Sequence, residues 1–510
     1  MLNEIAKSID NILNKITMYR LVLYYLIFLW INALLLSFFE LLPFTISHFL
    51  SATFVVLIAC WISNRLFSSI FKSLTNLESV YISALIIVLI ITPFRSISEL
   101  MFIIFVSLIA MASKYLFALN KKHIFNPVAF AVFATSVLTI GSASWWVGNQ
   151  WMLPAVLIGG ILIIRKIQRF SLFFSFLATA LFTMSVFSLI NGFNSLQIVS
   201  TTIINSPILF FSFVMLIEPL TTPTSKNFQI IYGILVGILF YPKLHIASYY
   251  ITPEASLLIG NIFSYIVNPN YKLMLFLKEK IKIAPDIYEF VFNLNKKINF
   301  SPGQYLEWTL GFKSPDNRGN RRYFTIASSP TEKLLRIGVK FYPDSSSFKK
   351  NLISLKSGDK ILAGQLSGDF VLPKNKSEKL VFIAGGIGIT PFRSMIKYLL
   401  DNKIKMPIVI FYSSKSKEEI VYKDVFDNAE KILGIKTIYS LTDLENIPKD
   451  WKGEKGRINS QMIKKHVPDF KYRSFYLSGP RPMVVGFEEV LRKMGIKGDS
   501  IKKDFFPGYA

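Results

Sequence analysis

The segment from Arg322 to Pro330 combines a cation, aromatic rings and hydroxyl groups within a few residues. A guanidinium can pair with a pyrophosphate, and an aromatic ring can lie against a flat heterocycle. A hydroxyl such as that of Thr325 can reach a reactive ring nitrogen. These residue types indicate a flavin site with Arg322, Tyr323, Phe324 and Thr325 as candidate ligands. The alternative interpretation is an edge strand that alternates polar and apolar side chains.

A glycine-rich turn, Gly385 to Pro391, directly follows the apolar run Leu380 to Ala384 and precedes an amphipathic helix predicted to reach about Leu400. Such a turn points free backbone N–H groups and the positive end of the helix dipole at a phosphate. Alternating strands and helices follow, as a parallel sheet requires, with strands predicted at 408–412, 436–440 and 474–478. The turn therefore predicts a dinucleotide site formed by Gly385, Gly386, Gly388 and Thr390.

These segments carry a resemblance to the ferredoxin–NADP reductase superfamily over residues 271–510. Its four blocks occur in order: Arg322 to Pro330, Ala384 to Pro391, Ser478 to Met483, and Asp504 to Tyr509. The resemblance implies FAD and NADH or NADPH as cofactors. It assigns FAD to Arg322, Phe324 and Thr325, the dinucleotide to the Gly385–Thr390 turn, and the nicotinamide side to Gly479 and Pro480.

One residue departs from the family pattern, because many members have cysteine where this chain has Ser478. A hydroxyl can still orient a nicotinamide, so we expect Ser478 to keep a catalytic role beside Thr325. Phe506 is our choice, over Phe505 and Tyr509, for the aromatic that covers the flavin. Lys415 and Lys417 could bind a ribose phosphate or be surface lysines, so the sequence leaves NADH and NADPH open, and we favour NADH.

Two soluble domains must position these residues. Residues 271–373 predict an antiparallel β-barrel, with a strand at 288–294 and a turn at 302–305. Residues 374–510 predict an α/β domain with a parallel sheet.

The N-terminal half predicts a polytopic α-helical membrane domain over residues 20–268, after a cytoplasmic segment at 1–19. About ten apolar stretches are long enough, or nearly so, to cross a bilayer. They centre near residues 30, 57, 86, 107, 137, 158, 181, 210, 236 and 261. The first apolar run starts too late and is too long for a signal peptide.

Charge predicts the orientation of these spans. Arg95 and Lys243 are the basic residues on one side of the predicted membrane, where Trp145, Trp146 and Trp151 would form an interfacial belt. The other side collects Lys7, Lys15, Arg20, Arg65, Lys72, Lys114, Lys121, Lys122, Arg165, Lys166, Arg169 and Lys226. This asymmetry places the N-terminus and the soluble half in the cytoplasm.

Two polar islands interrupt the apolar half, from His123 to Pro127 and from Glu218 to Thr224. An ionisable residue at membrane depth is costly without a partner, so Glu218 is a functional candidate. Helix capping by Asn126 and Thr221 is the alternative.

With the stretch from Thr224 to Gly233, these islands resemble the B/D membrane subunits of sodium-pumping NADH:quinone reductases and Rnf complexes, over roughly residues 75–268. The resemblance implies that His123, Asn126 and Glu218 contact a membrane flavin. The family's acidic residue is usually aspartate, and its covalent FMN is attached in a Ser-Gly-Ala-Thr segment that this chain lacks. We therefore expect a non-covalent flavin, riboflavin or FMN.

Composition excludes several kinds of site. Cys60 is the only cysteine, so the chain can form neither an internal disulfide nor an iron–sulfur cluster of its own. The three histidines of the membrane half, His48, His123 and His245, are not paired on one span, so we do not expect haem or another metal. The net charge of +25 fits attraction to an anionic membrane better than nucleic-acid binding, because the basic residues are scattered.

The sequence therefore predicts a membrane-bound flavin oxidoreductase that passes electrons from NAD(P)H through FAD to a membrane flavin, a quinone-type acceptor, or both. Its partners would be the lipid bilayer, quinone, and other electron-transfer subunits or soluble carriers. The alternatives are a redox-driven Na⁺ or H⁺ transporter and a membrane-anchored reductase of ferredoxin or flavodoxin. The acidic residues we assign near the spans are few: Glu40, Glu78, Glu99 and Glu218.

Overall fold

The structure is a computed structural model of the chain, and it divides into two compact units, Met1–Lys272 and Leu273–Ala510. It describes residues 9–504 except 10–11, 14–15, 72–76, 120–121, 247–248, 268–272, 295–297, 313–315 and 317–318.

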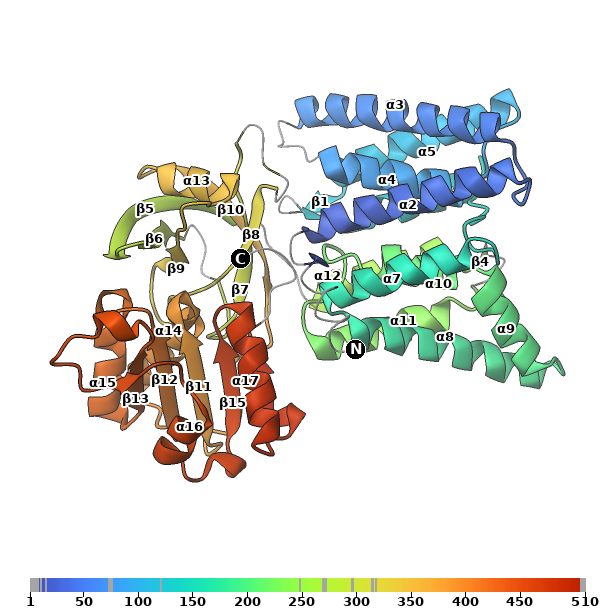
Figure 1. Cartoon of the computed structure of the whole chain (residues 1–510). Coiled ribbons are helices and arrows are strands. Elements are labelled where there is room, and N and C mark those ends of the chain that lie inside the picture. The colour runs from blue at the N-terminus through green and yellow to red at the C-terminus, as the bar shows by residue number, and fades with distance from the viewer. Residues whose placement is uncertain are drawn as a thin grey trace. The chain divides into compact units, whose positions relative to one another are not determined.

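The first unit is helical (Figure 1). Its helices are α2 (Met18–Phe38), α3 (Ile46–Ile70), α4 (Leu77–Ile90), α5 (Ile97–Leu116), α6 (Pro127–Val137), α7 (Leu153–Ile167), α8 (Phe170–Ile190), α9 (Ser195–Asn205), α10 (Ile208–Phe210), α11 (Lys226–Leu239) and α12 (Pro253–Val267). A π-helical turn, η1 (Phe211–Leu216), continues α10. The short strands β1 (Ala118–Leu119), β2 (Lys122–His123), β3 (His245–Ile246) and β4 (Tyr249–Tyr250) form two hairpins.

Four of the described helices, α2, α3, α5 and α8, are long and apolar enough to cross a membrane. A fifth span is possible if α9 and residues 208–216, which bend by 63°, count as one. The ten predicted centres all fall within helices or at a helix end, but ten membrane spans are not confirmed. The difference arises because turns interrupt the apolar runs. After Val137, for example, the chain turns through a left-handed Thr139.

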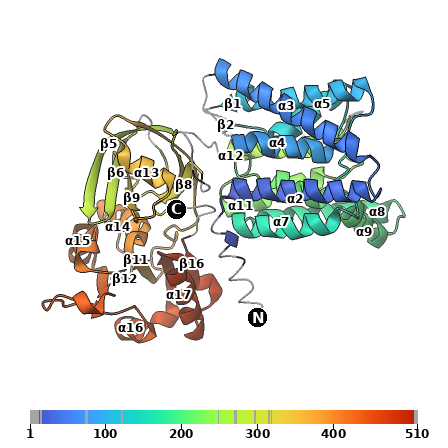
Figure 2. The same cartoon turned by 45° about the horizontal axis from the view of Figure 1, so that its top comes forward.

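Small residues let several of these helices approach closely. Helices α2 and α7 lie side by side in both views (Figures 1 and 2). A Cβ atom on Gly159 of α7 would lie 2.0 Å from the Tyr25 ring of α2. On α11, a Cβ on Gly233 would lie 2.1 Å from Ser175 Oγ of α8. Close contact of this kind is how helices associate in lipid, where the surrounding chains are as apolar as the helices. Cys60 is buried in α3.

The second unit begins with a six-stranded antiparallel sheet, which bears out the expected sheet type of the first soluble domain. Its strands are β5 (Leu273–Ala284), β6 (Ile287–Asn293), β7 (Tyr305–Thr309), β8 (Arg321–Thr325), β9 (Leu335–Lys340) and β10 (Lys360–Ser367), in the order β8-β7-β10-β5-β6-β9. Helix α13 (Ser347–Ser354) connects β9 to β10. Trp308, Phe290 and Phe292 are fully buried in the core of this sheet.

A six-stranded parallel sheet follows, as predicted. Its strands are β11 (Leu380–Gly385), β12 (Ile408–Ser414), β13 (Lys436–Leu441), β14 (Glu454–Lys455), β15 (Ser474–Ser478) and β16 (Ile501–Lys503), in the order β14-β13-β12-β11-β15-β16. The main helices are α14 (Thr390–Asp401), α15 (Lys423–Leu433), α16 (Ser460–His466) and α17 (Arg481–Lys493).

Side chains of the central strand β11 alternate between two cores. Leu380 and Phe382 pack with residues of α14 and α15, whereas Val381 and Ile383 pack with residues of α16 and α17. A strand buried on both faces needs the continuous apolar run that this segment has. Helices therefore cover both faces of the sheet, and the carboxyl ends of β11 and β15 lie together where the predicted site residues cluster.

Candidate functional site

Strand β8 carries the candidate flavin residues on two different faces. Arg322 and Phe324 share a face with Phe348 of α13, because the Arg322 guanidinium lies 5.2 Å from the Phe348 ring and the Phe324 ring lies 6.0 Å from it. Tyr323 is on the opposite face, where its hydroxyl donates to Glu307 Oε2 at 2.8 Å. The structure thus brings Arg322 and Phe324 together and directs Tyr323 elsewhere. Thr325, the last residue of β8, is buried.

The first turn of α13 is a candidate for the flavin phosphates that the sequence analysis did not identify. Ser346 caps this helix by accepting from Lys349 N, and Phe348 packs under Arg322. A helix N-terminus beside a guanidinium favours a phosphate, although Ser347 N of this turn already donates to Asp316 Oδ2 at 2.8 Å. The run of serines at 345–347 was the available signal.

The glycine-rich turn has the close packing that a dinucleotide loop requires. A Cβ atom on Gly388 would lie 2.5 Å from Gly479 Cα, and one on Gly385 would lie 2.3 Å from Met483 Sδ. Gly386 has a φ of +53°, and a Cβ there would meet open space among the described residues. The backbone at Gly386 is therefore free to approach a ligand at the start of α14. Thr390 begins α14, and its hydroxyl donates to Ile387 O at 3.2 Å.

Ser478 and Asp504 meet at the carboxyl end of β15. The Ser478 hydroxyl donates to Asp504 Oδ2 at 3.0 Å; Ser478 is buried and Asp504 is partly buried. Burial raises the pKa of the Asp504 carboxyl from its ordinary value of 3.8 to about 7, although the Ser478 hydrogen bond lowers it. Gly479 follows with a φ of +154° and leads through Pro480 into α17. Phe506, the predicted flavin cover, lies outside the described residues, as do Phe505 and Tyr509.

In the helical unit, the two predicted polar islands form one cluster. Asn126 Nδ2 donates to Glu218 Oε2 at 2.8 Å, and His123 Nε2 lies 3.5 Å from Glu218 Oε1. Thr221 Oγ1 also donates to Glu218 Oε2, at 3.2 Å. Asn126 and His123, 92 and 95 positions before Glu218, therefore share its carboxylate with the neighbouring Thr221. Asn126 also caps α6 by accepting from Ala129 N, so the capping alternative holds for Asn126 as well.

Asn261 and Tyr232 extend this cluster, and the sequence analysis missed both. Asn261 Oδ1 accepts from Asn126 N at 2.9 Å, and its Nδ2 group donates to the Tyr232 hydroxyl at 3.1 Å. Both side chains are buried. A polar residue in the middle of the apolar segment 253–267 was the signal.

Two expectations for the helical unit were wrong. Glu254 was omitted from the acidic residues near the spans, but it is 4% exposed, and its Oε1 accepts from Trp145 Nε1 at 2.7 Å. Trp145 and Trp146 were expected to form an interfacial belt with Trp151, yet both are buried, and Trp146 Nε1 donates to backbone carbonyls of residues 88 and 91. Each indole N–H donates to an acceptor inside the protein, as the N–H of a buried tryptophan usually does.

Comparison with known proteins agrees with the geometry of the second unit. Residues 382–489 match the family described as oxidoreductase NAD-binding domain. This half of the chain is the module of an NAD(P)H-dependent FAD oxidoreductase. It is of the ferredoxin reductase type, and FAD and NAD(P)H are its cofactors.

Several relatives are named as reductases. A glycine betaine monooxygenase reductase subunit of Pseudomonas aeruginosa is 25% identical over 213 residues, which cover 41% of this chain and 57% of the relative. NADH-cytochrome b5 reductase 1 of Aspergillus terreus is 27% identical over 241 residues, 45% of this chain and 80% of the relative. Among solved structures, the cytochrome b5 reductase domain of Ulva prolifera nitrate reductase covers 46% of this chain and 97% of its own, with 21% identity and a TM-score of 0.39. The chain spans little more than half the length of the first of these relatives.

Proposed function

We propose that this chain is a membrane-bound flavin oxidoreductase that passes electrons from NAD(P)H through FAD to a membrane flavin, a quinone-type acceptor, or both. The reductase module supports the first half of this route. The polar cluster around Glu218, whose side chain is 19% exposed, supports the second half, and it is the observation that carries the proposal. A bound flavin supplies hydride acceptance and the release of electrons one at a time.

In the reductase module, Arg322 would bind the FAD pyrophosphate, aided by the first turn of α13. Phe324 would lie against the flavin ring, and Thr325 would present its hydroxyl to the reactive edge. The backbone of Gly385, Gly386 and Gly388 would receive the dinucleotide phosphates, with Thr390 at the helix start. Ser478, with Gly479 and Pro480, would orient the nicotinamide, and Phe506 would cover the flavin.

In the helical unit, His123, Asn126 and Glu218 would contact a non-covalent riboflavin or FMN. A carboxylate buried among apolar helices is expensive, so such residues are kept where they serve a site. Here the carboxylate is matched by amide, hydroxyl and imidazole groups from separate segments. The resemblance to the B/D subunits of sodium-pumping and Rnf complexes supports the same assignment.

The apolar helices support placement in a bilayer, and we infer a multi-pass inner-membrane protein whose N-terminus and reductase module are cytoplasmic. The charge asymmetry of the loops supports this orientation. Quinone and other electron-transfer subunits would be its partners.

Flavin quantification on the purified full chain tests the proposal. Two flavins per chain and NADH oxidation stimulated by ubiquinone or menaquinone analogues are expected. Glu218→Gln should lower the quinone-stimulated rate and the content of the second flavin while leaving reduction of ferricyanide by NADH intact. Glu78→Gln is the matched control, because Glu78 is a carboxylate of the same unit that pairs with Arg20 at 3.0 Å. One flavin per chain and no response to quinones would contradict the membrane route.

Two observations favour other routes. Relatives named as reductase subunits favour a membrane-anchored reductase of a soluble acceptor. Glu254 is a buried acid, and it adds to the few acidic residues near the predicted spans. Because an ion path through a membrane needs such residues, Glu254 favours redox-driven movement of Na⁺ or H⁺. Stimulation by added ferredoxin or flavodoxin would identify the first route, and an NADH-driven ion gradient in proteoliposomes would identify the second.

A further inference from the structure

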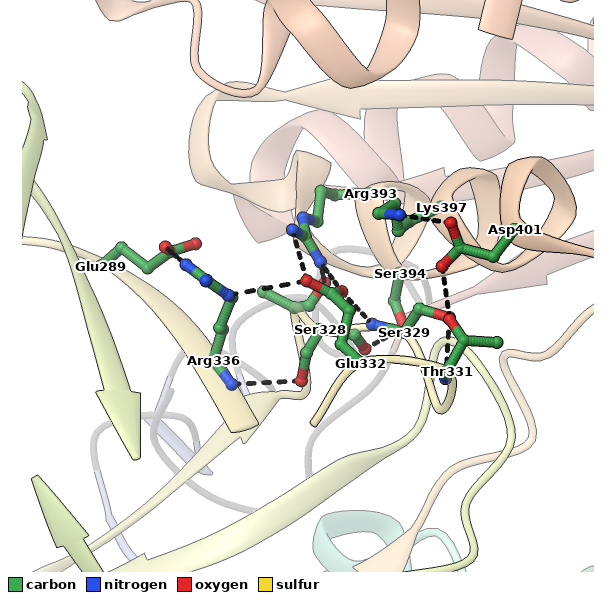
Figure 3. A network of polar contacts seen from close by, with 11 residues as sticks. Glu289, Ser328, Ser329, Thr331, Glu332, Arg336, Arg393, Ser394, Lys397 and Asp401 are labelled. Atoms are coloured by element: carbon green, nitrogen blue, oxygen red, sulfur yellow. Dashed lines mark hydrogen bonds and ion pairs between the residues drawn. The ribbon is translucent and has the colours of Figure 1, made fainter. Parts of the chain in front are cut away.

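A chain of alternating charges joins the end of the flavin strand to the first turns of α14 (Figure 3). Glu289 of β6 pairs with Arg336 of β9, and Arg336 Nε lies 3.6 Å from Glu332 Oε1. Glu332 then pairs with Arg393 of α14 through both guanidinium nitrogens, with Nη2 to Oε1 at 3.0 Å. Two carboxylates thus balance two guanidiniums.

The same network holds the backbone that follows β8. Arg393 Nη1 donates to Ala327 O at 3.0 Å, and Ser394 Oγ donates to Ser328 O at 2.7 Å. Glu332 also accepts from Ser329 N at 2.6 Å. Three successive residues of the predicted flavin segment are therefore bound directly to α14 or to the carboxylate that pairs with it.

A second contact lies about two turns further along α14. Thr331 Oγ1 donates to Asp401, which also pairs with Lys397 (Figure 3). Residues 393, 394, 397 and 401 lie on one face of the helix, because they recur at the spacing of helical turns. Arg393, Ser394 and Asp401 of this face contact the segment 327–332.

This network lies close to both predicted cofactor-binding segments. Ala327 lies two residues after Thr325, and Arg393 lies three residues after Thr390. The Glu332–Arg393 pair, called the clamp below, therefore joins the segment predicted to contact the flavin to the helix whose N-terminus is predicted to bind the dinucleotide.

Stability alone is a weak reason for such an arrangement. The side chains of Arg393 and Glu289 are only 8% and 5% exposed. The desolvation cost of a buried ion pair often equals or exceeds its attraction, and an apolar replacement of similar volume is often as stable. A bidentate pair between a guanidinium and a carboxylate, by contrast, fixes geometry in two dimensions.

We propose that Glu332 and Arg393 are positioning residues that set the alignment of nicotinamide and flavin for hydride transfer. This inference rests on the NAD(P)H-to-FAD step of the proposed function. Reacting atoms must lie about 3–3.5 Å apart, and a misplacement of about 1 Å can cost about 100-fold in rate. Two rigid contacts between the two binding segments would hold that distance.

Anaerobic stopped-flow reduction of the detergent-solubilised full chain by NADH and by NADPH tests the inference. Glu332→Gln and Arg393→Gln should each lower the limiting rate of flavin reduction roughly 10- to 100-fold. FAD content, the apparent Kd for the nucleotide, and reoxidation of the reduced flavin by ferricyanide should not change. The double variant should lose no more than the slower single variant, because both substitutions remove one shared contact.

A second ion pair between the same two domains is the matched control. Lys340, at the end of β9, pairs with Glu419 at 2.8 Å, with 17% and 16% of the two side chains exposed. Glu419→Gln should keep a near wild-type rate of flavin reduction, because this pair lies at the end of β9 rather than on segment 327–332. Equal slowing of Glu419→Gln and Glu332→Gln would overturn the inference in favour of simple tethering.

A milder variant covers the case in which the charge variants do not fold. Ser394→Ala removes only the hydrogen bond to Ser328 O and should slow flavin reduction a few-fold. The inference would be overturned if Ser394→Ala and the charge variants that fold all reduced the flavin at the wild-type rate. Additive losses in the double variant would also overturn it. Failure of either nucleotide to reduce the wild-type flavin would instead overturn the proposed function.

Discussion

Two partly buried carboxyl groups, those of Asp504 and Glu218, stand at the predicted reaction centres of the two units, and each accepts from at least one side chain distant in the sequence. Asp504 accepts from Ser478, and Glu218 accepts from Asn126 and Thr221. Neither partnership could be predicted from local spacing. The sequence marked Ser478, Asn126 and Glu218 as polar residues in motifs, but only the fold reveals which of them meet.

The pKa of Asp504 leads to a prediction about stability. Its pKa is about 7 in the folded protein and 3.8 ordinarily, so the folded state binds the proton more tightly. The resulting stabilisation is complete below about pH 4 and is lost as pH rises through about 7, and it is worth on the order of 4 kcal/mol. Thermal unfolding of the detergent-solubilised chain, followed by release of FAD fluorescence, should show this loss between about pH 4 and 7.

Asp504→Asn is the control for that effect, because an amide does not titrate. The melting temperature of the variant should lack the pH dependence that comes from Asp504. Its stability should therefore rise relative to that of the wild type as pH increases. Parallel melting curves for the two proteins across this range would contradict the assignment.

At the scale of elements, the soluble half was predictable because its signals are local. The apolar run 380–384 could only be a doubly buried strand before a glycine turn, and β11 and α14 follow that prediction closely. The helical half was less predictable. Helix α9 has no predicted counterpart, since its segment 195–205 is too polar to register as a span. Strand alternation also separated Tyr323 from Arg322, because the face that each residue occupies depends on where the strand begins.

The glycine turn leads to a prediction at this scale. Gly388→Ala should raise the KM for NADH strongly or abolish binding, because the added Cβ would lie 2.5–2.6 Å from backbone atoms of Ser478 and Gly479. Steady-state reduction of ferricyanide by NADH measures the effect.

Gly486 of α17 provides the matched control. A Cβ there meets nothing within 4 Å, so Gly486→Ala should keep activity and stabilise the helix by about 0.5–1 kcal/mol. A Gly388→Ala enzyme with the same KM as Gly486→Ala would contradict the proposed dinucleotide loop.

For the molecule as a whole, each unit has hydrophobic cores of its own. Residues 273–510 should therefore fold when expressed without the helices and should reduce ferricyanide with NADH at a rate close to that of the full chain. Quinone-stimulated oxidation should be lost. Assays of the full chain and the truncated chain with the same acceptors check this. If the truncated chain kept every activity, the helical unit would be only an anchor.

Whole-molecule features were the hardest to foresee. The Glu332–Arg393 clamp joins residues 61 positions apart, and nothing in either local pattern distinguishes them from surface charges. Glu254 was missed for a similar reason, since an acid beside a proline at the start of an apolar run resembles a solvent-exposed helix end. Only the fold shows that Trp145 covers it.

The buried position of the single cysteine has a practical consequence. Because Cys60 is enclosed within α3, a thiol-reactive spin label would leave it unmodified in the folded chain. New cysteines at Leu196 in the first unit and Tyr472 in the second, 81% and 83% exposed, could then be labelled as a pair without removing any native residue. Pulsed electron paramagnetic resonance on that pair would compare the separation of the two units in oxidised and reduced protein.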